Sequence, residues 1–130
     1  PGWLARRREI VAQYAGAFRD LTEAEPLAIH PDREPAWHLY VVRLALEQLR
    51  VGRDRVLEAL RAEHIGANVH YIPVPWHPYY RSIGYERGCW PVSEAAYDRI
   101  VSLPMFPTMT DADVADVVEA TTKVLRYYRR

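Results

Sequence analysis

The most constraining feature of this sequence is an apolar stripe near its C-terminus, which calls for a helix and for a surface that the helix can cover. The stripe recurs at three- and four-residue spacing and consists of Val114, Val117, Val118, Thr121, Val124, Leu125 and Tyr128. We expect this helix to open at Thr110, because Asp111 and Asp113 then lie in its first turn, where carboxylates suit the positive helix end. An apolar stripe of this kind must pack against another element.

Upstream segments predict the elements that bury it. Residues 3–21 predict a helix with an apolar face formed by Ile10, Tyr14, Phe18 and Leu21. Residues 22–36 contain three prolines and predict a connecting loop. A strand is expected over residues 38–46, HLYVVRLAL, where β-branched and aromatic residues gather, with one face made of His38, Tyr40, Val42 and Leu44.

The second half predicts shorter elements. A helix follows Gly52, with Val56, Leu57 and Leu60 inward and Gly66 as its C-terminal cap. Residues 67–74 predict a second strand, and a short helix is expected from an N-cap at Ser93. Residues 102–105 suit only a brief edge strand, since Pro104 has no N–H to donate.

This order of elements predicts an α/β fold of the α+β sandwich type, with a small, mostly antiparallel sheet covered by helices on one face. The chain has 130 residues, which suits a single domain over residues 1–130. It begins with Pro1, Gly2 and Trp3 and enters a helical pattern at once, so we expect it to be a piece of something longer.

Composition narrows the classes of partner and the compartment. Seventeen basic residues balance seventeen acidic ones, so no overall field draws the chain to nucleic acid or membrane. No apolar run approaches the ~20 residues of a membrane span. Cys89 is the only cysteine, which excludes an internal disulfide and fits the reducing cytoplasm.

No complete catalytic set is visible in the residues themselves. His64, His70 and His77 match neither a helical zinc motif nor a Cys/His finger, so we expect no metal site. Cys89 has no strand–turn–helix elbow around it and is expected to be a structural or incidental thiol.

Residues 68–80, NVHYIPVPWHPYY, are the one stretch that suggests a binding site. Prolines stiffen it, and its aromatic rings and polar tips suit a flat, polar ligand. The alternative is that these aromatic residues fold back and cap a small core. As neighbours on a strand face opposite sides, we expect His70 to contact a ligand and Tyr71 to pack inward, because a polar imidazole costs more to bury. The candidate binding residues are His70, Tyr71, His77, Tyr79 and Tyr80.

Several runs in fixed order resemble a known family. They are AWHLYVVRL, then HIGANVHYIPVPWHPYYR, a Gly-Tyr pair at 84–85, and SLPMFPTMTDADVADVV. Together they resemble the small C-terminal domain of the DegT/DnrJ/EryC1/StrS family of pyridoxal-phosphate (PLP)-dependent sugar aminotransferases, over nearly the whole chain. Within that family they most resemble the transaminases that aminate UDP-4-keto-6-deoxy-N-acetylhexosamines on the route to pseudaminic acid.

The resemblance implies an enzyme that this chain cannot complete alone. Members of the family carry the Schiff-base lysine and the cofactor in a large N-terminal domain, which is absent from these residues. Lys123 is the only lysine here and is expected on the surface of the last helix. Pro75 and Trp76 also depart from the family, which usually has a histidine after the IPV motif.

We therefore expect one domain of a PLP-dependent enzyme that moves an amino group from glutamate to a 4-keto-6-deoxy sugar nucleotide. The full enzyme is expected to be a homodimer, and the isolated chain is expected to bind no cofactor and to be inactive. The alternative is a stand-alone, non-catalytic domain that binds a small ligand or RNA across its sheet, with Tyr40 and Tyr71 as the candidate stacking residues.

Overall fold

A three-stranded antiparallel sheet forms the centre of the protein, in the order β1-β2-β3. The computed structural model describes residues 2–130. Its strands and longer helices are α1 (Gly2–Ala17), β1 (Ala24–Pro26), β2 (Tyr40–Leu44), α2 (Arg53–Ala62), α3 (Pro78–Ser82), α4 (Pro91–Tyr97), β3 (Ile100–Leu103) and α5 (Asp111–Tyr128). Short 3-10 turns cover Leu46–Gln48 and Val74–Trp76.

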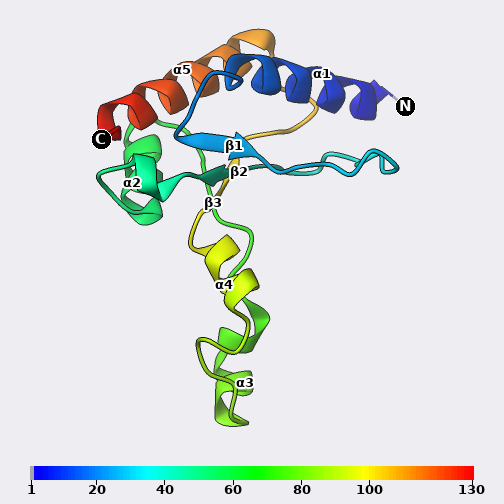
Figure 1. The fold of residues 1–130 in the computed structure, drawn as a ribbon. Coiled ribbons are helices and arrows are strands. Elements are labelled where there is room, and N and C mark those ends of the chain that lie inside the picture. The colour runs from blue at the N-terminus through cyan, green and yellow to red at the C-terminus, as the bar shows by residue number, and fades with distance from the viewer. Residues whose placement is uncertain (1) are drawn as a thin grey trace.

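Helices α1 and α5 lie side by side over one face of the sheet, and α2 lies at its end (Figure 1). The predicted α/β class, with an antiparallel sheet covered on one face, is therefore confirmed. No helix formed by residues 2–130 is both long enough and apolar enough to cross a membrane.

Strand β2 is the middle of the sheet and alternates as the sequence predicts. Tyr40, Val42 and Leu44 are buried, whereas Arg43 is exposed and lies opposite Glu25 on β1. Burial raises the pKa of the Tyr40 hydroxyl to about 12. The strand runs from Tyr40 to Leu44, so the prediction that it starts at His38 and continues to residue 46 was wrong at both ends.

The C-terminal helix follows its sequence pattern closely. Thr110 caps α5, because its hydroxyl accepts from the Asp113 amide at 3.1 Å while the Asp113 carboxylate accepts from the Thr110 amide at 2.7 Å. The buried face of the helix consists of Val114, Val117, Ala120, Thr121, Val124 and Leu125. The predicted stripe is confirmed, with Val118 and Tyr128 at its half-buried margins.

Helix α1 is held against this start of α5 by polar contacts. The Arg6 guanidinium donates to the Met109 carbonyl oxygen at 2.8 Å and to the Asp111 carboxylate at 2.8 Å. The Tyr14 hydroxyl donates to the Pro104 carbonyl oxygen at 2.7 Å. Helix α1 ends at Ala17, earlier than predicted, but Phe18 is still buried because the chain turns back over the core.

Two predictions for segments between the helices were wrong for backbone reasons. The expected loop over residues 22–36 contains β1, which is an edge strand and so tolerates Pro26 at its end. The expected strand over residues 67–74 is absent apart from a single bridge between Asn68 and Ser102, since two prolines follow at 73 and 75.

Two further errors concern helix ends. His64, with a φ of 62°, takes the left-handed position after α2 that Gly66 was expected to supply. Helix α4 begins at Pro91 rather than after a Ser93 cap, because proline is well suited to the first helical position. The brief strand expected over residues 102–105 lies at Ile100–Leu103, which leaves Pro104 outside it.

A buried carboxylate joins the two ends of the fold. Glu23, just before β1, is fully buried and accepts a hydrogen bond from the Arg129 guanidinium at the end of α5. Arg129 holds the pKa of the Glu23 carboxyl below its usual value, against the opposing effect of burial. The pair ties the C-terminus to the first strand.

We predict that Glu23→Gln lowers the free energy of unfolding by about 1 kcal/mol at pH 7, a modest value because Arg129 is half exposed and solvent screens the pair. Since the folded-state pKa is lowered, the stabilisation is present above the unfolded value of about 4.5 and is lost as pH falls through the folded value. Urea unfolding at pH 7 and pH 3 measures this. Glu25→Gln, in an exposed pair with Arg43, is the matched control and should change little. The prediction is contradicted if Glu23→Gln and Glu25→Gln lower the free energy of unfolding equally. It is also contradicted if the difference in unfolding free energy between Glu23→Gln and the unchanged chain is the same at pH 7 and pH 3.

Candidate functional site

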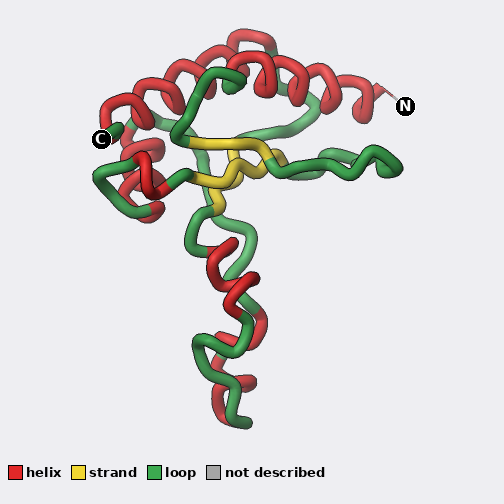
Figure 2. The backbone as a smooth tube through the Cα atoms, viewed as in Figure 1, coloured by secondary structure: helices red, strands yellow, loops and turns green. Residues whose placement is uncertain are grey.

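Residues 69–99 leave the body of the protein as a separate projection, which we call the arm. The arm extends away from the sheet and contains α3 and α4 (Figure 1), with short helical pieces joined by loops and no strand (Figure 2). Its two ends meet in the body, where the Asn68 amide donates to the Ser102 carbonyl at 3.1 Å and the Ser102 amide donates to the Asn68 carbonyl at 2.8 Å. All five candidate binding residues lie on this arm.

At the root of the arm, His70 is more buried than Tyr71, which is the reverse of the expected packing. His70 is half-buried, and its Nδ1 lies 2.9 Å from the Ser102 hydroxyl. Tyr71 is 74% exposed, with its ring edge-on to the imidazole at 4.7 Å between centroids. The expected inward packing of Tyr71 was wrong because residues 70 and 71 belong to no strand, so strand alternation does not apply to them. Contact of either residue with a ligand stays a prediction.

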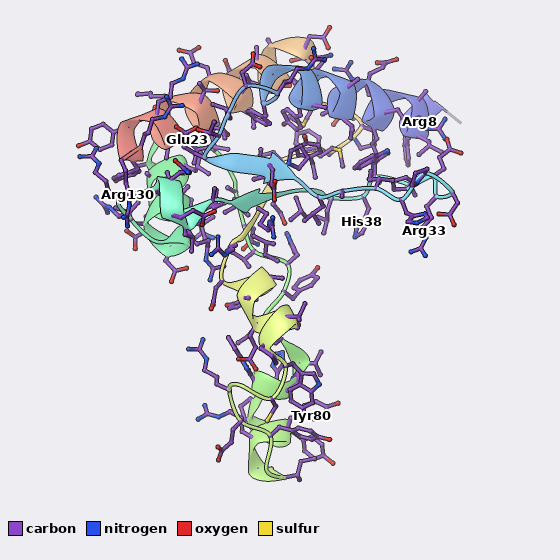
Figure 3. The ribbon with its side chains drawn as sticks, in the orientation of Figure 1. Arg8, Glu23, Arg33, His38, Tyr80 and Arg130 are labelled. Atoms are coloured by element: carbon purple, nitrogen blue, oxygen red, sulfur yellow. The ribbon has the colours of Figure 1, made fainter. Side chains whose placement is uncertain are left out.

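Towards the tip, aromatic rings pack on one another in a row. Tyr79 contacts Tyr80 at 5.4 Å between ring centroids, Tyr80 contacts Tyr85 at 5.9 Å, and Tyr85 contacts Trp90 at 5.1 Å. Tyr79 is 69% exposed, and Tyr80 lies far from the body (Figure 3). This row presents tyrosine hydroxyls and ring edges to solvent.

A second row places two adjacent aromatic rings between two arginines and connects the arm to α2. The Arg87 guanidinium lies over the Trp76 ring at 3.9 Å, and Trp76 meets Tyr97 edge-on at 5.3 Å. Tyr97 in turn lies under the guanidinium of Arg53, a buried residue at the start of α2, at 4.8 Å. Each cation is attracted to the negative face of its ring, so the row orients the arm against the body.

One carboxylate organises the loop between the two rows. Glu94, in the first turn of α4, accepts from the Gly88 amide at 2.8 and 2.9 Å and from the Trp90 amide at 3.2 Å. The hydrogen bond from the Gly88 amide, followed by that from the Trp90 amide, lowers the pKa of the Glu94 carboxyl, and the positive charge of Arg87 lowers it further. Gly88 has a φ of 96°, a conformation that side chains rarely adopt.

The structure brings together only some of the predicted residues. His70 and Tyr71 form one pair and Tyr79 and Tyr80 another, and no hydrogen bond or ring contact among residues 2–130 joins the two pairs. His77 is exposed and precedes α3.

Trp76, Arg87 and Glu94 were not among the predicted site residues. The only sequence signal for them is an acidic residue in the first turn after Trp90 and Pro91, which predicts backbone capping. Nothing in the spacing of Trp76 and Arg87 reveals that they touch.

Neither a metal nor an amine nucleophile has an obvious place in these residues. No group of three or more His, Cys, Asp or Glu side chains that could hold a metal occurs within residues 2–130. Cys89 is exposed on the arm. Lys123 lies on α5, where its amine is 2.7 and 2.8 Å from the two carboxylate oxygens of Glu63.

Known proteins resemble this chain over nearly its whole length. The profile of the DegT/DnrJ/EryC1/StrS aminotransferase family matches residues 1–122. The spore coat polysaccharide biosynthesis protein SpsC of Bacillus subtilis is 39% identical over 123 residues, which are 93% of this chain and 32% of SpsC. The chain spans about a third of the length of the curated relatives it matches.

Solved structures agree with the sequence matches. Spr1654 of Streptococcus pneumoniae, assigned as a sugar aminotransferase and solved in PLP, PMP and apo forms, matches with a TM-score of 0.86 and 28% identity, covering 98% of this chain and 32% of Spr1654. Helicobacter pylori PseC, an aminotransferase of pseudaminic acid biosynthesis, matches with a TM-score of 0.86 over 97% of this chain and 33% of PseC. At 23% identity the likeness to PseC is one of fold.

We predict that Glu94→Gln loosens the arm, because a neutral amide binds the Gly88 and Trp90 amides more weakly than a carboxylate does. Hydrogen exchange at those two amides should become at least about five-fold faster, while the amides of α5 keep their protection. In the unchanged chain, protection at Gly88 and Trp90 should persist below pH 4.5, the ordinary pKa of a glutamate, and should fall only as pH drops through the lowered folded-state pKa of Glu94.

Glu86→Gln is the control for this test, since Glu86 is exposed on the same arm and none of its side-chain atoms makes a hydrogen bond or ion pair with residues 2–130. Unchanged exchange in Glu94→Gln, or equal acceleration in both variants, would show that the carboxylate does not organise the loop.

Proposed function

Because the chain belongs to the DegT/DnrJ/EryC1/StrS aminotransferase family, we propose that it is the small C-terminal domain of a PLP-dependent nucleotide-sugar aminotransferase. The observation that supports this proposal is the exposure of aromatic side chains on the arm. The hydrophobic core lies in the body and does not include them. Large exposed apolar patches on a soluble domain usually mark a surface that binds something. In the proposed enzyme, the arm lies beside the sugar nucleotide.

The residues of this chain do not by themselves fit the cofactor. PLP enzymes hold the cofactor through a lysine amine. Lys123 is the only lysine in the sequence, and its amine is engaged by Glu63 on the surface formed by α2 and α5. We therefore propose that a separate large domain of the same enzyme supplies the lysine and the cofactor site, in agreement with the greater length of the relatives.

The finer parts of the proposal rest on sequence resemblance. The runs VHYIP and HPYYR favour a 4-keto-6-deoxy sugar nucleotide as amino acceptor, in the manner of the pseudaminic acid transaminases, with glutamate as donor. We propose a homodimeric, cytoplasmic enzyme in which Tyr71, Tyr79 and Tyr80 contact the sugar nucleotide directly. His70 and His77 complete the proposed set of contacts.

The alternative function, RNA binding across the sheet, gains no support from the geometry. Recognition of RNA by a sheet needs exposed aromatic residues on the central strands. Tyr40 is buried in β2, with 2% of its surface exposed, and Tyr71 lies on the arm rather than on the sheet. The two tyrosines therefore do not form a stacking surface.

A first prediction concerns the isolated chain. Mixed with PLP, it should develop no stable Schiff-base absorbance band and should transfer no amino group, because Lys123, its only lysine, lies on the surface in an ion pair with Glu63. Lys123→Arg, which keeps the charge and removes the amine nucleophile, should give the same spectrum as the unchanged chain. A stable band that is lost in Lys123→Arg, together with amino transfer, would contradict the division of roles between two domains.

A second prediction concerns the longer enzyme that contains this domain. Tyr79→Ala should raise the KM for the sugar nucleotide by about ten-fold, the effect of losing one well-placed aromatic contact. Tyr71→Ala should raise the KM similarly, because Tyr71 is another proposed contact of the sugar nucleotide. Since Tyr71 is exposed, its truncation disturbs little of the body.

Tyr127→Ala is a matched control, since Tyr127 and Tyr79 are both 69% exposed but Tyr127 lies at the end of α5. If the arm variants leave KM and kcat unchanged while lowering the melting temperature, then the aromatic residues of the arm only stabilise the domain.

A further inference from the structure

The arm contains a hollow that none of the five predicted contact residues lines. The hollow, which we call the arm pocket, has a volume of about 740 Å³ and is bounded by Ile72, Trp76, Arg81, Ser82, Tyr85, Glu86 and Arg87. Pockets that bind small molecules commonly have volumes of this order. The arm pocket thus offers a site on the arm apart from its exposed tyrosines.

Two arginines, Arg81 and Arg87, line this pocket. Neither Arg81 nor Arg87 forms an ion pair with any carboxylate among residues 2–130, whereas arginines of the body such as Arg6, Arg43 and Arg129 do. Glu86 is the one acidic residue in the lining, and it is exposed. The neighbouring Glu94 carboxylate accepts hydrogen bonds from the Gly88 and Trp90 amides. The pocket therefore carries a net positive charge.

Contacts behind the pocket hold Arg87 in place. Its guanidinium lies over the Trp76 ring, 3.9 Å from the ring centre, and Trp76 contacts Tyr97, which in turn contacts Arg53 of the body. The loop that follows Arg87 is fixed by Glu94. A guanidinium that is already ordered loses less conformational entropy when it binds an anion, and its planar fork suits two oxygens of a phosphate.

The remaining lining residues favour more than a simple anion. Tyr85 offers an aromatic ring at the edge of the pocket, and Ile72 an apolar side chain that is 40% exposed. The Ser82 hydroxyl donates to the Tyr79 carbonyl at 2.7 Å, so its lone pairs remain free to accept from a ligand hydroxyl. A pocket with paired cations and an aromatic wall matches an anion joined to a flat ring.

We propose that the arm pocket binds the nucleoside diphosphate of the sugar substrate, with Arg81 and Arg87 on the diphosphate and Tyr85 beside the base. This inference rests on the proposed function, because it identifies the residues that hold one part of the proposed substrate. It separates the substrate's contacts into two groups: the exposed tyrosines for the sugar, and the arm pocket for the nucleotide.

The test is titration calorimetry of this chain with three probes: uridine diphosphate, uridine and inorganic pyrophosphate. Uridine diphosphate should bind at one site per chain, more tightly than pyrophosphate and much more tightly than uridine, and added salt should weaken it. Arg81→Ala and Arg87→Ala should each weaken binding about ten-fold, the usual effect of losing a charged hydrogen bond to a phosphate.

Two further variants separate charge from structure. Arg87→Lys keeps the charge but not the fork, and it should fall between Arg87→Ala and the unchanged chain. Arg19→Ala removes an exposed arginine just after α1, far from the arm, that forms no ion pair with residues 2–130, and it should bind as the unchanged chain does. The amide spectra of α4 and α5 confirm that each variant is folded.

Three results would overturn the proposal. The first is that uridine diphosphate shows no saturable binding up to about 10 mM, a range that covers affinities near 1 mM. The others are that neither Arg81→Ala nor Arg87→Ala weakens its binding, or that it binds no more tightly than pyrophosphate. The proposed function has a separate test, since the longer enzyme can transfer an amino group to a sugar nucleotide even if this chain fails to bind uridine diphosphate. If the longer enzyme transfers no amino group to a sugar nucleotide, that result counts against the proposed function and not against binding of uridine diphosphate in the arm pocket.

Discussion

Strand β2 is hydrogen-bonded along both of its edges, and the position of every other element of the body depends on what that strand buries. Its inward face places Tyr40, Val42 and Leu44 beneath α1 and α5, so both helices must present apolar stripes at this level. The stripes differ in regularity: that of α5 runs its whole length, whereas α1 buries only Ile10 and Tyr14 within its helical residues. Hydrogen bonds from Arg6 and Tyr14 to the segment before α5 strengthen the weaker helix contact.

The arm is stabilised by a different kind of interaction from the body. Residues 81–92 are exposed throughout, so no apolar core can hold this segment. Edge-on aromatic pairs, two cation–ring contacts and one carboxylate on backbone amides replace that core. Interactions of this kind are individually weak and partly screened by solvent, which places the arm among the parts of a structure that open most easily. A surface that must adapt to a ligand or to another domain benefits from that property.

The sequence predicts the body better than the arm, for a physical reason. Residues that face a core recur with the period of their element, so the stripe of α5 and the alternation in β2 both follow from the order of apolar and polar residues. In the arm, the important neighbours are far apart in sequence and follow no period: Trp76 meets Tyr97, and Arg53 reaches Tyr97 from another helix. Aromatic composition alone suggests a binding stretch at residues 68–80. It does not reveal that His70 turns towards Ser102 while Tyr71 faces solvent.

The paired hydrogen bonds between Asn68 and Ser102 hold the two ends of the arm together, so the arm is an insertion between two neighbouring points of the body. The body does not depend on the length of chain between these two residues, because the cost of closing a loop rises only slowly with its length. Changes in the arm, including insertions and deletions, are therefore decoupled from the folding of the sheet and its covering helices. A protein built in this way can exchange the chemistry of its projecting segment during evolution while keeping one scaffold, and the same property makes residues 69–99 a natural cassette for grafting between relatives.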